Sequence, residues 1–294
     1  MSTPLRLRIR GGLTRALIWV LLLTTWEAAY RIVHWRPYIF PAPSHVLDSM
    51  LGMLGIDTGF GEDLHRGWPQ ASDVGPHQHS LLMRIVRSPL ISANFVSAWR
   101  LIVGFAISII IGTMLGVLMW RWTPFDEFLR PVCLGLQTLP SVCWVPLAVL
   151  IFGLNEFGIL FVLVMGSTFG MAVSMRDGLK AVPPLYRRAG LMMGARRWRL
   201  YRFVLFPAGL PALASSLRQG FSFAWRSLMG AELILFANHH GLGFLLMTGG
   251  DNSEISQVVA VMIVMVIIGM LADRLAFAPL ERRVHTRFGL GGAN

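Results

Sequence analysis

The stretch Leu101–Trp120 reads LIVGFAISIIIGTMLGVLMW, which is 20 residues without a charged side chain. About 20 apolar residues are needed to cross the hydrocarbon core of a bilayer as a helix. Three more uncharged runs are of similar length: Pro131–Leu154, Phe157–Met175 and Ile255–Ala272 have 24, 19 and 18 residues. Four such runs in one chain predict a membrane protein rather than a soluble domain with buried helices.

Two further segments are long enough to cross a membrane but carry charges. The segment 14–34 contains Ala16–Tyr30, which is apolar apart from Glu27, and the segment 208–236 holds Arg218, Arg226 and Glu232. With these two, the sequence predicts six transmembrane helices in a single transmembrane domain, residues 1–294. The approximate spans are 14–34, 95–120, 128–154, 157–176, 208–236 and 255–275.

The distribution of the basic residues predicts the topology. Of the 294 residues only 14% are charged, yet the formal net charge is +11. If the N-terminus is cytoplasmic, the inside segments carry 17 Lys or Arg residues and the outside segments carry 5. This excess is typical of cytoplasmic loops. We therefore expect both termini in the cytoplasm, and we interpret the basicity as topology rather than as nucleic-acid binding.

The N-terminal segment is also similar to a signal peptide, because Arg6, Arg8 and Arg10 precede an apolar run. Thr24–Glu27 interrupts the region where a cleavage site of small residues is expected. We therefore expect an uncleaved first helix. The polar region 31–98 after it contains an irregular loop at residues 55–80.

The sequence suggests no metal, cofactor or disulfide. Cys133 and Cys143 lie inside one apolar run. His77, His79 and the pair His239–His240 lack the further ligands that a metal site requires.

The third predicted span is interrupted by Leu139-Pro140 and Val145-Pro146. Proline removes a helix hydrogen bond and disfavours helical geometry at the residue before it. Two interpretations stay open: a kink without a function, or a broken helix whose segment Gln137–Trp144 lines a passage. Candidate residues for this passage are Gln137, Pro140 and Trp144.

The fifth predicted span carries polar residues at spacings of three and four, which puts them near one helix face. In the functional interpretation, Arg218 or Arg226 is an uncompensated cation that favours anions in a passage. In the alternative, Arg218 reaches the cytoplasmic boundary and Glu232 caps the outer end of the helix. The candidates for the passage are Arg218, Ser222, Trp225, Arg226 and Glu232.

The loop 177–207 predicts a knob of two short helices on the cytoplasmic face. Pro183-Pro184 begins the first helix, and Gly194 ends it in a left-handed turn. A second, basic helix follows at Arg196–Leu205, and Pro207 marks its boundary. A basic hairpin lying on anionic lipid is the alternative. The apolar face of the first helix is formed by Leu185, Ala189, Met192 and Met193.

This knob resembles a known motif. Arg188–Ala195, RAGLMMGA, followed by Val204–Pro207, VLFP, is similar to the EAA motif of bacterial ABC-importer permeases. Arg188 stands where the motif has glutamate and reverses the charge there. Outside residues 55–80, further segments resemble the nitrate/sulfonate/taurine branch of that family. They are Trp26-Glu27, Pro41–Val46, Leu136–Pro140, Trp144–Leu147, Phe152–Leu154, Ala224–Arg226, Ala231–Leu233, Gly241–Gly243 and Leu280–Arg283.

The resemblance implies an all-α polytopic protein similar to type I ABC importer permeases, with a cytoplasmic coupling-helix loop at 177–207. It implies a bacterial inner membrane and no cofactor. Its partners would be cytoplasmic ABC ATPase subunits, a solute-binding protein, a second and identical permease subunit, and membrane lipid. The residues implied to couple to the ATPase are Leu185, Arg188, Ala189, Gly190, Met193, Gly194, Ala195 and Pro207.

The chain itself is not expected to hydrolyse ATP. A phosphate-binding Walker A loop needs lysine followed by serine or threonine, and the single lysine of this chain, Lys180, is followed by alanine. An ion-gradient-driven secondary transporter is the alternative, with Glu27, Asp273 and Glu281 as its carboxylates. The branch resemblance suggests a small anion as the substrate, such as an alkanesulfonate, taurine or nitrate.

Overall fold

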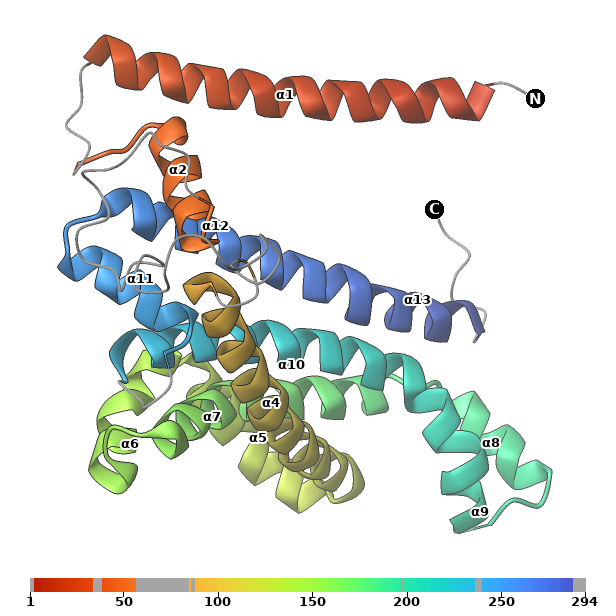
Figure 1. Ribbon diagram of the computed structural model, residues 1–294. Coiled ribbons are helices and arrows are strands. Elements are labelled where there is room, and N and C mark those ends of the chain that lie inside the picture. Colours follow the sequence, from red (N-terminus) through yellow and green to blue (C-terminus); the bar gives the residue numbers. More distant parts are fainter. Residues whose placement is uncertain are drawn as a thin grey trace. The chain divides into compact units, whose positions relative to one another are not determined.

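The computed structural model describes residues 3–33, 39–56, 85, 88–196, 198–235 and 240–287, and all the regular structure in these ranges is helical (Figure 1). Most of the 55–80 loop, and the histidines at 77, 79 and 239, lie outside the described residues. The α-helices are α1 (Thr3–Val33), α2 (Pro43–Met53), α4 (Pro89–Arg121), α5 (Thr123–Thr138), α6 (Val145–Phe152), α7 (Glu156–Lys180), α8 (Pro184–Met192), α9 (Trp198–Leu200), α10 (Phe206–Ile234), α11 (Leu242–Asp251), α12 (Ile255–Ala272) and α13 (Ala278–Arg287). A 3₁₀ turn, η2, covers Ser141–Trp144, and the π-helical turns η3 and η4 cover Tyr201–Leu205 and Asp273–Phe277.

Several described helices have the length and composition of membrane spans. α4, α7 and the stretch Ile255–Val284 qualify outright, and the bent pair of α5 with η2 and α6 makes a fourth if it counts as one span. α1 and α10 lie where the first and fifth spans are predicted. The polytopic helical class is therefore confirmed, and the number of six spans stays a prediction.

The third predicted span is broken rather than kinked. α5 ends at Thr138, and the axis of the following helical segment is turned by 102°. Leu139 has extended backbone angles, φ −69° and ψ 129°, as expected for a residue that precedes a proline. Pro146 lies in the first turn of α6, where proline is tolerated. The break predicted at Leu139-Pro140 is confirmed, and Val145-Pro146 is the start of a helix.

The chain forms two compact units, one of residues 1–92 and 245–264 and the other of residues 93–244 and 265–294. In the first unit, Ser44 at the start of α2 donates a hydrogen bond of 3.3 Å to Glu27 of α1. In the second unit, α6, α7 and α10 share a buried apolar core. Its members are Val145, Ala148, Ile159, Val162, Leu163, Ala224, Leu228, Ala231 and Leu235.

Hydroxyl groups join the helices of the second unit where they cross. Ser167 of α7 donates to Ser108 of α4 over 2.7 Å, and Ser227 of α10 donates to the carbonyl of Val162 in α7 over 2.8 Å. Small hydroxyl side chains let helices approach closely and hydrogen-bond in an apolar medium. α4, α7 and α10 are therefore the packed centre of this unit.

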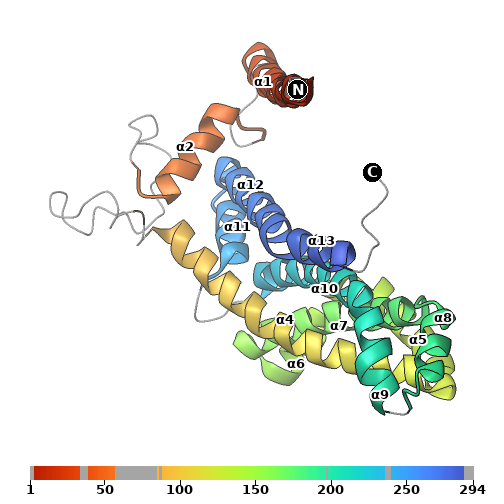
Figure 2. The ribbon, with the colours of Figure 1, turned by 90° about the vertical axis from the view of Figure 1, so that its right-hand side faces the viewer.

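The end of the second unit where α7 ends and α10 begins carries the two short helices α8 and α9. They project from it in Figure 1 and face the viewer in Figure 2. The opposite end holds Glu156 at the start of α7 and Glu232 near the end of α10. α7 and α10 run from one of these ends to the other. We call the end with α8 and α9 the knob end, and the end with Glu156 and Glu232 the far end.

Candidate functional site

The first helix of the knob has well-defined ends. Pro183 precedes α8, so the missing N–H of Pro184 falls in the first turn, where no intrahelical partner is needed. At the other end Gly194 has φ +79°, which confirms the predicted left-handed turn. The N–H of Ala195 donates to Gly190 O, and the N–H of Gly194 donates to Leu191 O. This pair of hydrogen bonds is the Schellman motif, which fixes the direction in which the chain leaves the helix.

The two helices of the knob pack through a glycine. Gly190 is buried, and a Cβ atom added to it would lie 2.8 Å from Cδ1 of Leu200 and 3.0 Å from Cγ2 of Val204. A larger residue would therefore push α8 away from α9 and η3. The outer surface of the knob is exposed and partly apolar, with Met192 88% exposed. Its other exposed apolar side chains are Leu185, Tyr186, Leu191 and Met193.

The second half of the knob differs from the prediction. Instead of a separate helix ending before Pro207, a short α9 continues through the π-helical turn η3 directly into α10. Pro207 lies in the first turn of α10, directly after η3. The helical chain therefore continues past this proline.

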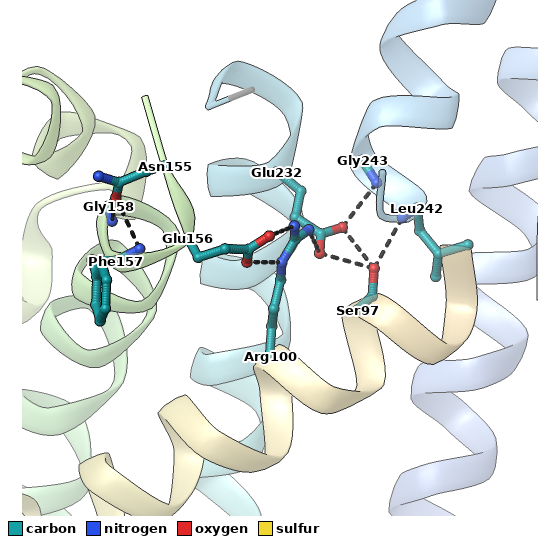
Figure 3. A network of polar contacts seen from close by, with 9 residues as sticks. All are labelled: Ser97, Arg100, Asn155, Glu156, Phe157, Gly158, Glu232, Leu242 and Gly243. Atoms are coloured by element: carbon teal, nitrogen blue, oxygen red, sulfur yellow. Dashed lines mark hydrogen bonds and ion pairs between the residues drawn. The ribbon is translucent and has the colours of Figure 1, made fainter. Parts of the chain in front are cut away.

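At the far end, Arg100 of α4 joins two carboxylates from α7 and α10 (Figure 3). Its Nε and Nη2 donate to Glu156 over 2.7 and 2.6 Å, and its Nη1 donates to Glu232 over 2.8 Å. Arg100 and Glu232 are each only 3% exposed. An arginine that bonds one carboxylate through two N–H groups is held in a fixed orientation, so this contact fixes three helices relative to one another.

The same carboxylate also receives the start of α11. The hydroxyl of Ser97 donates to Glu232 over 2.7 Å and accepts the N–H of Leu242 over 2.9 Å. The N–H of Gly243 donates to Glu232 directly over 3.1 Å. A carboxylate at a helix N-terminus satisfies N–H groups that have no partner within the helix. Glu232 therefore caps α11, whereas the sequence suggested a cap for its own helix.

Glycine is required where α11 approaches Glu232. A Cβ atom on Gly243 would lie 2.5 Å from Cβ of Glu232, and one on Gly241 would overlap the Glu232 carboxylate. Real Cβ atoms do not approach so closely. The segment Gly241-Leu242-Gly243 therefore matches Glu232 sterically as well as through hydrogen bonds.

Two further ion-pair clusters lie toward the knob end. Asp126 of α5 accepts from Arg176 Nε and from Lys180 Nζ of α7, each over 2.6 Å. These contacts hold the first half of the broken helix against α7.

In the second cluster, Arg218 of α10 donates to Asp273 over 2.7 and 2.8 Å and to Glu281 over 2.7 Å. Ser215, one turn earlier, donates to Glu281 over 2.9 Å. The expectation that Arg218 is an uncompensated cation is therefore wrong, because two carboxylates that lie 55 and 63 residues away face it.

A polar strip runs along the exposed side of α10. Ser222 and Arg226 are exposed, and Gln219 one turn earlier accepts a hydrogen bond of 2.6 Å from Ser174 of α7. The Nε of Arg226 donates to the carbonyl of Ser222 over 3.1 Å, and its Cζ lies 5.1 Å from the centre of the Phe223 ring. Among the described residues no carboxylate pairs with Arg226.

The break between α5 and α6 packs against α7 and α10 through η2. The Trp144 ring packs near Phe161 and Phe169 of α7, at centroid distances of 6.5 and 6.3 Å. Two buried polar atoms here, Nε1 of Trp144 and Oε1 of Gln137, have no hydrogen-bond partner among the described residues. The break therefore presents a donor and an acceptor that the described chain does not itself satisfy.

Comparison with known proteins identifies the family. The family model described as binding-protein-dependent transport system inner membrane component matches residues 108–285, from within α4 to α13. This chain belongs to that family. It is a permease component of an ATP-driven importer, and the family implies ATPase and binding-protein partners.

Individual relatives agree with this assignment. The permease is 29% identical over 266 residues to the taurine transport system permease protein of Escherichia coli, covering 90% of this chain and 85% of that protein. It is 27% identical over 180 residues to the nitrate import permease protein of a Synechocystis strain, covering 61% of this chain and 65% of that protein. The resemblance to the nitrate/sulfonate/taurine branch is therefore confirmed.

A solved structure shares the fold of the permease. A chain of the MetNI methionine ABC transporter in an inward-facing conformation superposes with a TM-score of 0.52 at 20% identity, over 63% of this chain and 93% of that chain. At this identity the likeness concerns the fold alone.

The residues predicted to line the path of the permease differ in their exposure. Ser222, Arg226 and Pro140 are exposed, and Gln137 and Trp144 lie half-buried at the break. Trp225 packs on Phe221 and lies close to Gly269. Glu232 is buried in the far-end network, away from the strip formed by its predicted neighbours, because α4 and α11 cover that part of α10.

Sequence reasoning missed the partners of these residues. The sequence analysis does not indicate Arg100, Glu156 and Ser97 as partners of Glu232, or Asp126 as a partner of Arg176. A charge within an apolar segment has a high energetic cost, so each such residue is expected to have a partner. That cost is the feature of the sequence that could have indicated these contacts.

Proposed function

We propose that the knob is the element through which the permease docks on its ATPase, and that the permease carries small anions through a path formed with a second copy of this chain. The observation that carries the docking proposal is the exposed apolar surface of a knob whose shape is fixed by the Schellman turn and the Gly190 contact.

The chemistry of the knob surface favours a protein partner. Leu185, Met192 and Met193 are 70%, 88% and 80% exposed on the outer side of the knob. Methionine, aromatic residues and arginine are enriched in the centres of protein interfaces, and Tyr186, Arg187 and Arg188 flank these side chains on α8. A helix that lies on lipid does not require a fixed turn, whereas a groove does require a defined shape. The other coupling residues are Ala189, Gly190, Gly194, Ala195 and Pro207.

The charge of Arg188 gives the docking surface its own specificity. Arg188 is exposed and occupies the position at which the EAA motif carries glutamate. A groove that accepts this knob should present an acidic or neutral surface to Arg188, because like charges at an interface are repulsive. We therefore propose that the matching ATPase differs at this point from one that accepts a glutamate.

Three features support small anions as substrates. Two relatives are named for nitrate and taurine transport. Arg226 and Ser222 are exposed on one side of α10, the fifth predicted span. Polar atoms of Gln137 and Trp144 lie at the break beside the same helix. We propose that the path runs along Gln137, Pro140, Trp144, Ser222 and Arg226.

A second copy of the permease would enclose this path. A charged strip inside a bilayer needs water or protein beside it, not lipid. Two copies that face one another across the Ser222–Arg226 side of α10 would provide this environment, while the apolar outer surfaces contact membrane lipid. ATP hydrolysis takes place on the separate ATPase. In agreement with this, the single lysine of this chain is not followed by the serine or threonine of a Walker A loop.

The proposed orientation puts the knob and both termini in the cytoplasm. Single cysteines at Met192 and Asn252, both exposed, test it in a variant without Cys133 and Cys143. We expect a membrane-impermeant thiol reagent added outside intact cells to label position 252 and not position 192. External labelling at position 192 would contradict both the topology and the docking proposal.

Uptake by the whole transporter tests the function. The permease, its ATPase and its binding protein are reconstituted in liposomes, and the uptake of nitrate and of taurine is measured. We expect uptake of at least one of these anions that requires ATP and persists when ionophores dissipate ion gradients. Uptake that needs a gradient and no ATP would favour a secondary transporter.

A further inference from the structure

Arg226 differs from three other arginines in the long helices of the second unit, Arg100, Arg176 and Arg218. Arg100, Arg176 and Arg218 each bond two carboxylates. Arg226 has no carboxylate partner among the described residues, although it lies in the same helix as Arg218. Because these three guanidinium groups are neutralised and that of Arg226 is not neutralised by a described residue, a positive charge stays available at position 226.

The side chain of Arg226 is nevertheless held in a defined position. Its Nε donates to the carbonyl of Ser222, and its guanidinium lies over the Phe223 ring. Phe223 is fixed in turn, since a Cβ atom on Gly170 of α7 would lie only 2.7 Å from its Cε2. Because a guanidinium has five N–H groups, the four on Nη1 and Nη2 remain without a partner in the part of the chain that the structure describes.

The surroundings of this guanidinium are polar. The Ser222 side chain is exposed on the same strip, and its hydroxyl likewise bonds to no described residue. Gln219 and Ser174 continue the polar surface by one turn toward the knob end. Position 226 is also eight residues from the end of α10, which is about 12 Å at 1.5 Å per residue. Arg226 therefore lies within α10, about two turns from its nearer end.

An available charge within a membrane span has a steep energetic cost unless water or a counter-ion meets it. Two parallel N–H groups of a guanidinium match two oxygens of one nitrate, sulfonate or carboxylate group, and this fork gives both strength and orientation. A solute that lacks an anionic group with two oxygens gains nothing from this arrangement.

We propose that Arg226, with the hydroxyl of Ser222, is an anion-binding point within the membrane path, where an oxyanion released by the binding protein is held during translocation. This inference rests on the proposed function, because it assigns the anion preference of the path to one guanidinium. The ligand class is a small anion that presents two oxygens to the fork.

The test uses the complete transporter in liposomes, with taurine and nitrate as probes and the variants Arg226→Gln and Arg226→Lys. Loss of a hydrogen bond to a charged group lowers occupancy of this point, and we expect maximal uptake per transporter to fall about tenfold or more for Arg226→Gln. The concentration for half-maximal uptake is determined by the binding protein and should change less than about threefold. Arg226→Lys keeps the charge and should retain more uptake than Arg226→Gln.

The second readout is the rate of ATP hydrolysis in the presence of the substrate-bound binding protein. If Arg226 acts on the substrate, the Gln variant still hydrolyses ATP, so more ATP is consumed per anion. Arg282→Gln, which removes an exposed arginine from α13, is the control and should behave as the unmodified protein. Should Arg226→Gln fail to assemble, Ser222→Ala replaces it, with an expected loss of about threefold or more in uptake at unchanged assembly.

The outcomes separate this inference from the function on which it rests. If the unmodified transporter carries neither probe, the anion function fails. If it carries one of them and Arg226→Gln, or its substitute Ser222→Ala, matches it in both uptake and ATP per anion, the function stands and the binding point does not. Equal loss in the Gln and Lys variants together with loss of stimulated hydrolysis would assign Arg226 a structural role and also overturn the inference.

Discussion

The guanidinium of Arg100 and the carboxylate of Glu232 lie 2.8 Å apart although 132 residues separate them in the chain, and each residue is 3% exposed. Glu156 adds a second carboxylate to the same guanidinium. Three helices and the start of a fourth are thus joined at one point of the far end. The charges compensate one another only while all members are present.

Removing the arginine should therefore destabilise the permease strongly. In Arg100→Leu, Glu156 and Glu232 face one another without a cation, and breaking a buried pair costs about 3–5 kcal/mol. The measurement is the free energy of unfolding in detergent, monitored by helical circular dichroism in denaturant. Arg31→Leu is the control, because Arg31 pairs with Glu27 at the surface, with 74% of its own side chain exposed, and such pairs contribute about 1 kcal/mol or less. Similar losses in both variants would contradict the central role of Arg100.

Gly243→Ala should be far more harmful than Gly250→Ala, although both lie in α11. The added methyl group at position 243 would meet Glu232 at 2.5 Å, whereas at position 250 it meets nothing within 4 Å. We expect Gly243→Ala to destabilise by about 1–3 kcal/mol, the usual cost of overpacking. Gly250→Ala should be neutral or stabilising by up to about 1 kcal/mol. Thermal melting of the two purified variants distinguishes them, and a harmless Gly243→Ala would show that α11 does not dock closely on Glu232.

Gly194→Val should uncouple the transporter without preventing membrane insertion. A β-branched residue at φ +79° is strained, by roughly 1–2 kcal/mol, and relief of the strain rotates α8 away from α9. We expect normal amounts in the membrane together with loss of ATP-dependent uptake and of ATPase co-purification.

The matched variant at this position is Gly194→Asn, since asparagine adopts left-handed geometry more readily than other residues. It should keep most of the activity. Full uptake by the valine variant with a normally bound ATPase would show that the shape of the knob does not matter for coupling.

Arg218→Gln should affect stability rather than anion selection. Arg218 is satisfied by Asp273 and Glu281, but all three side chains are partly exposed, so we expect a loss of about 1 kcal/mol. Uptake of nitrate relative to taurine, per assembled transporter, should not change. Asp273→Asn should cost a similar amount, and the double variant should cost less than the two losses together because the pair is shared. A changed anion preference in Arg218→Gln would show that this residue does line the translocation path.

Local features of the fold could be predicted from the sequence because they depend on neighbouring residues. The apolar run Leu101–Trp120 predicts a helix by its length, and Leu139-Pro140 predicts a break because the effect of proline is confined to adjacent residues. Gly194 predicts the turn of the knob for the same reason. Each of these predictions agrees with the structure.

Contacts between distant segments could not be predicted in this way. No residue near Arg218 in the sequence indicates that its partner is Asp273, which lies 55 residues further on. The regular spacing of Ser222 and Glu232 suggested a shared role. However, α4 and α11 cover Glu232, whereas Ser222 is exposed. The continuation of η3 into α10 past Pro207 depends on a widened helical turn, which a search for ordinary α-helices does not anticipate.

The cross-links between α4, α7 and α10 determine how the second unit can move. Ion pairs join these three helices at the far end, and hydroxyl bonds join them between the ends. The knob is continuous with α7 through residues 181–183 and with α10 through η3. A force applied to the knob is therefore transmitted through two anchors into one stiff body, which should pivot as a whole instead of bending helix by helix. Arg226 travels with that body, so the exposure of its guanidinium to one side of the membrane or the other would follow directly from the angle at which the ATPase holds the knob.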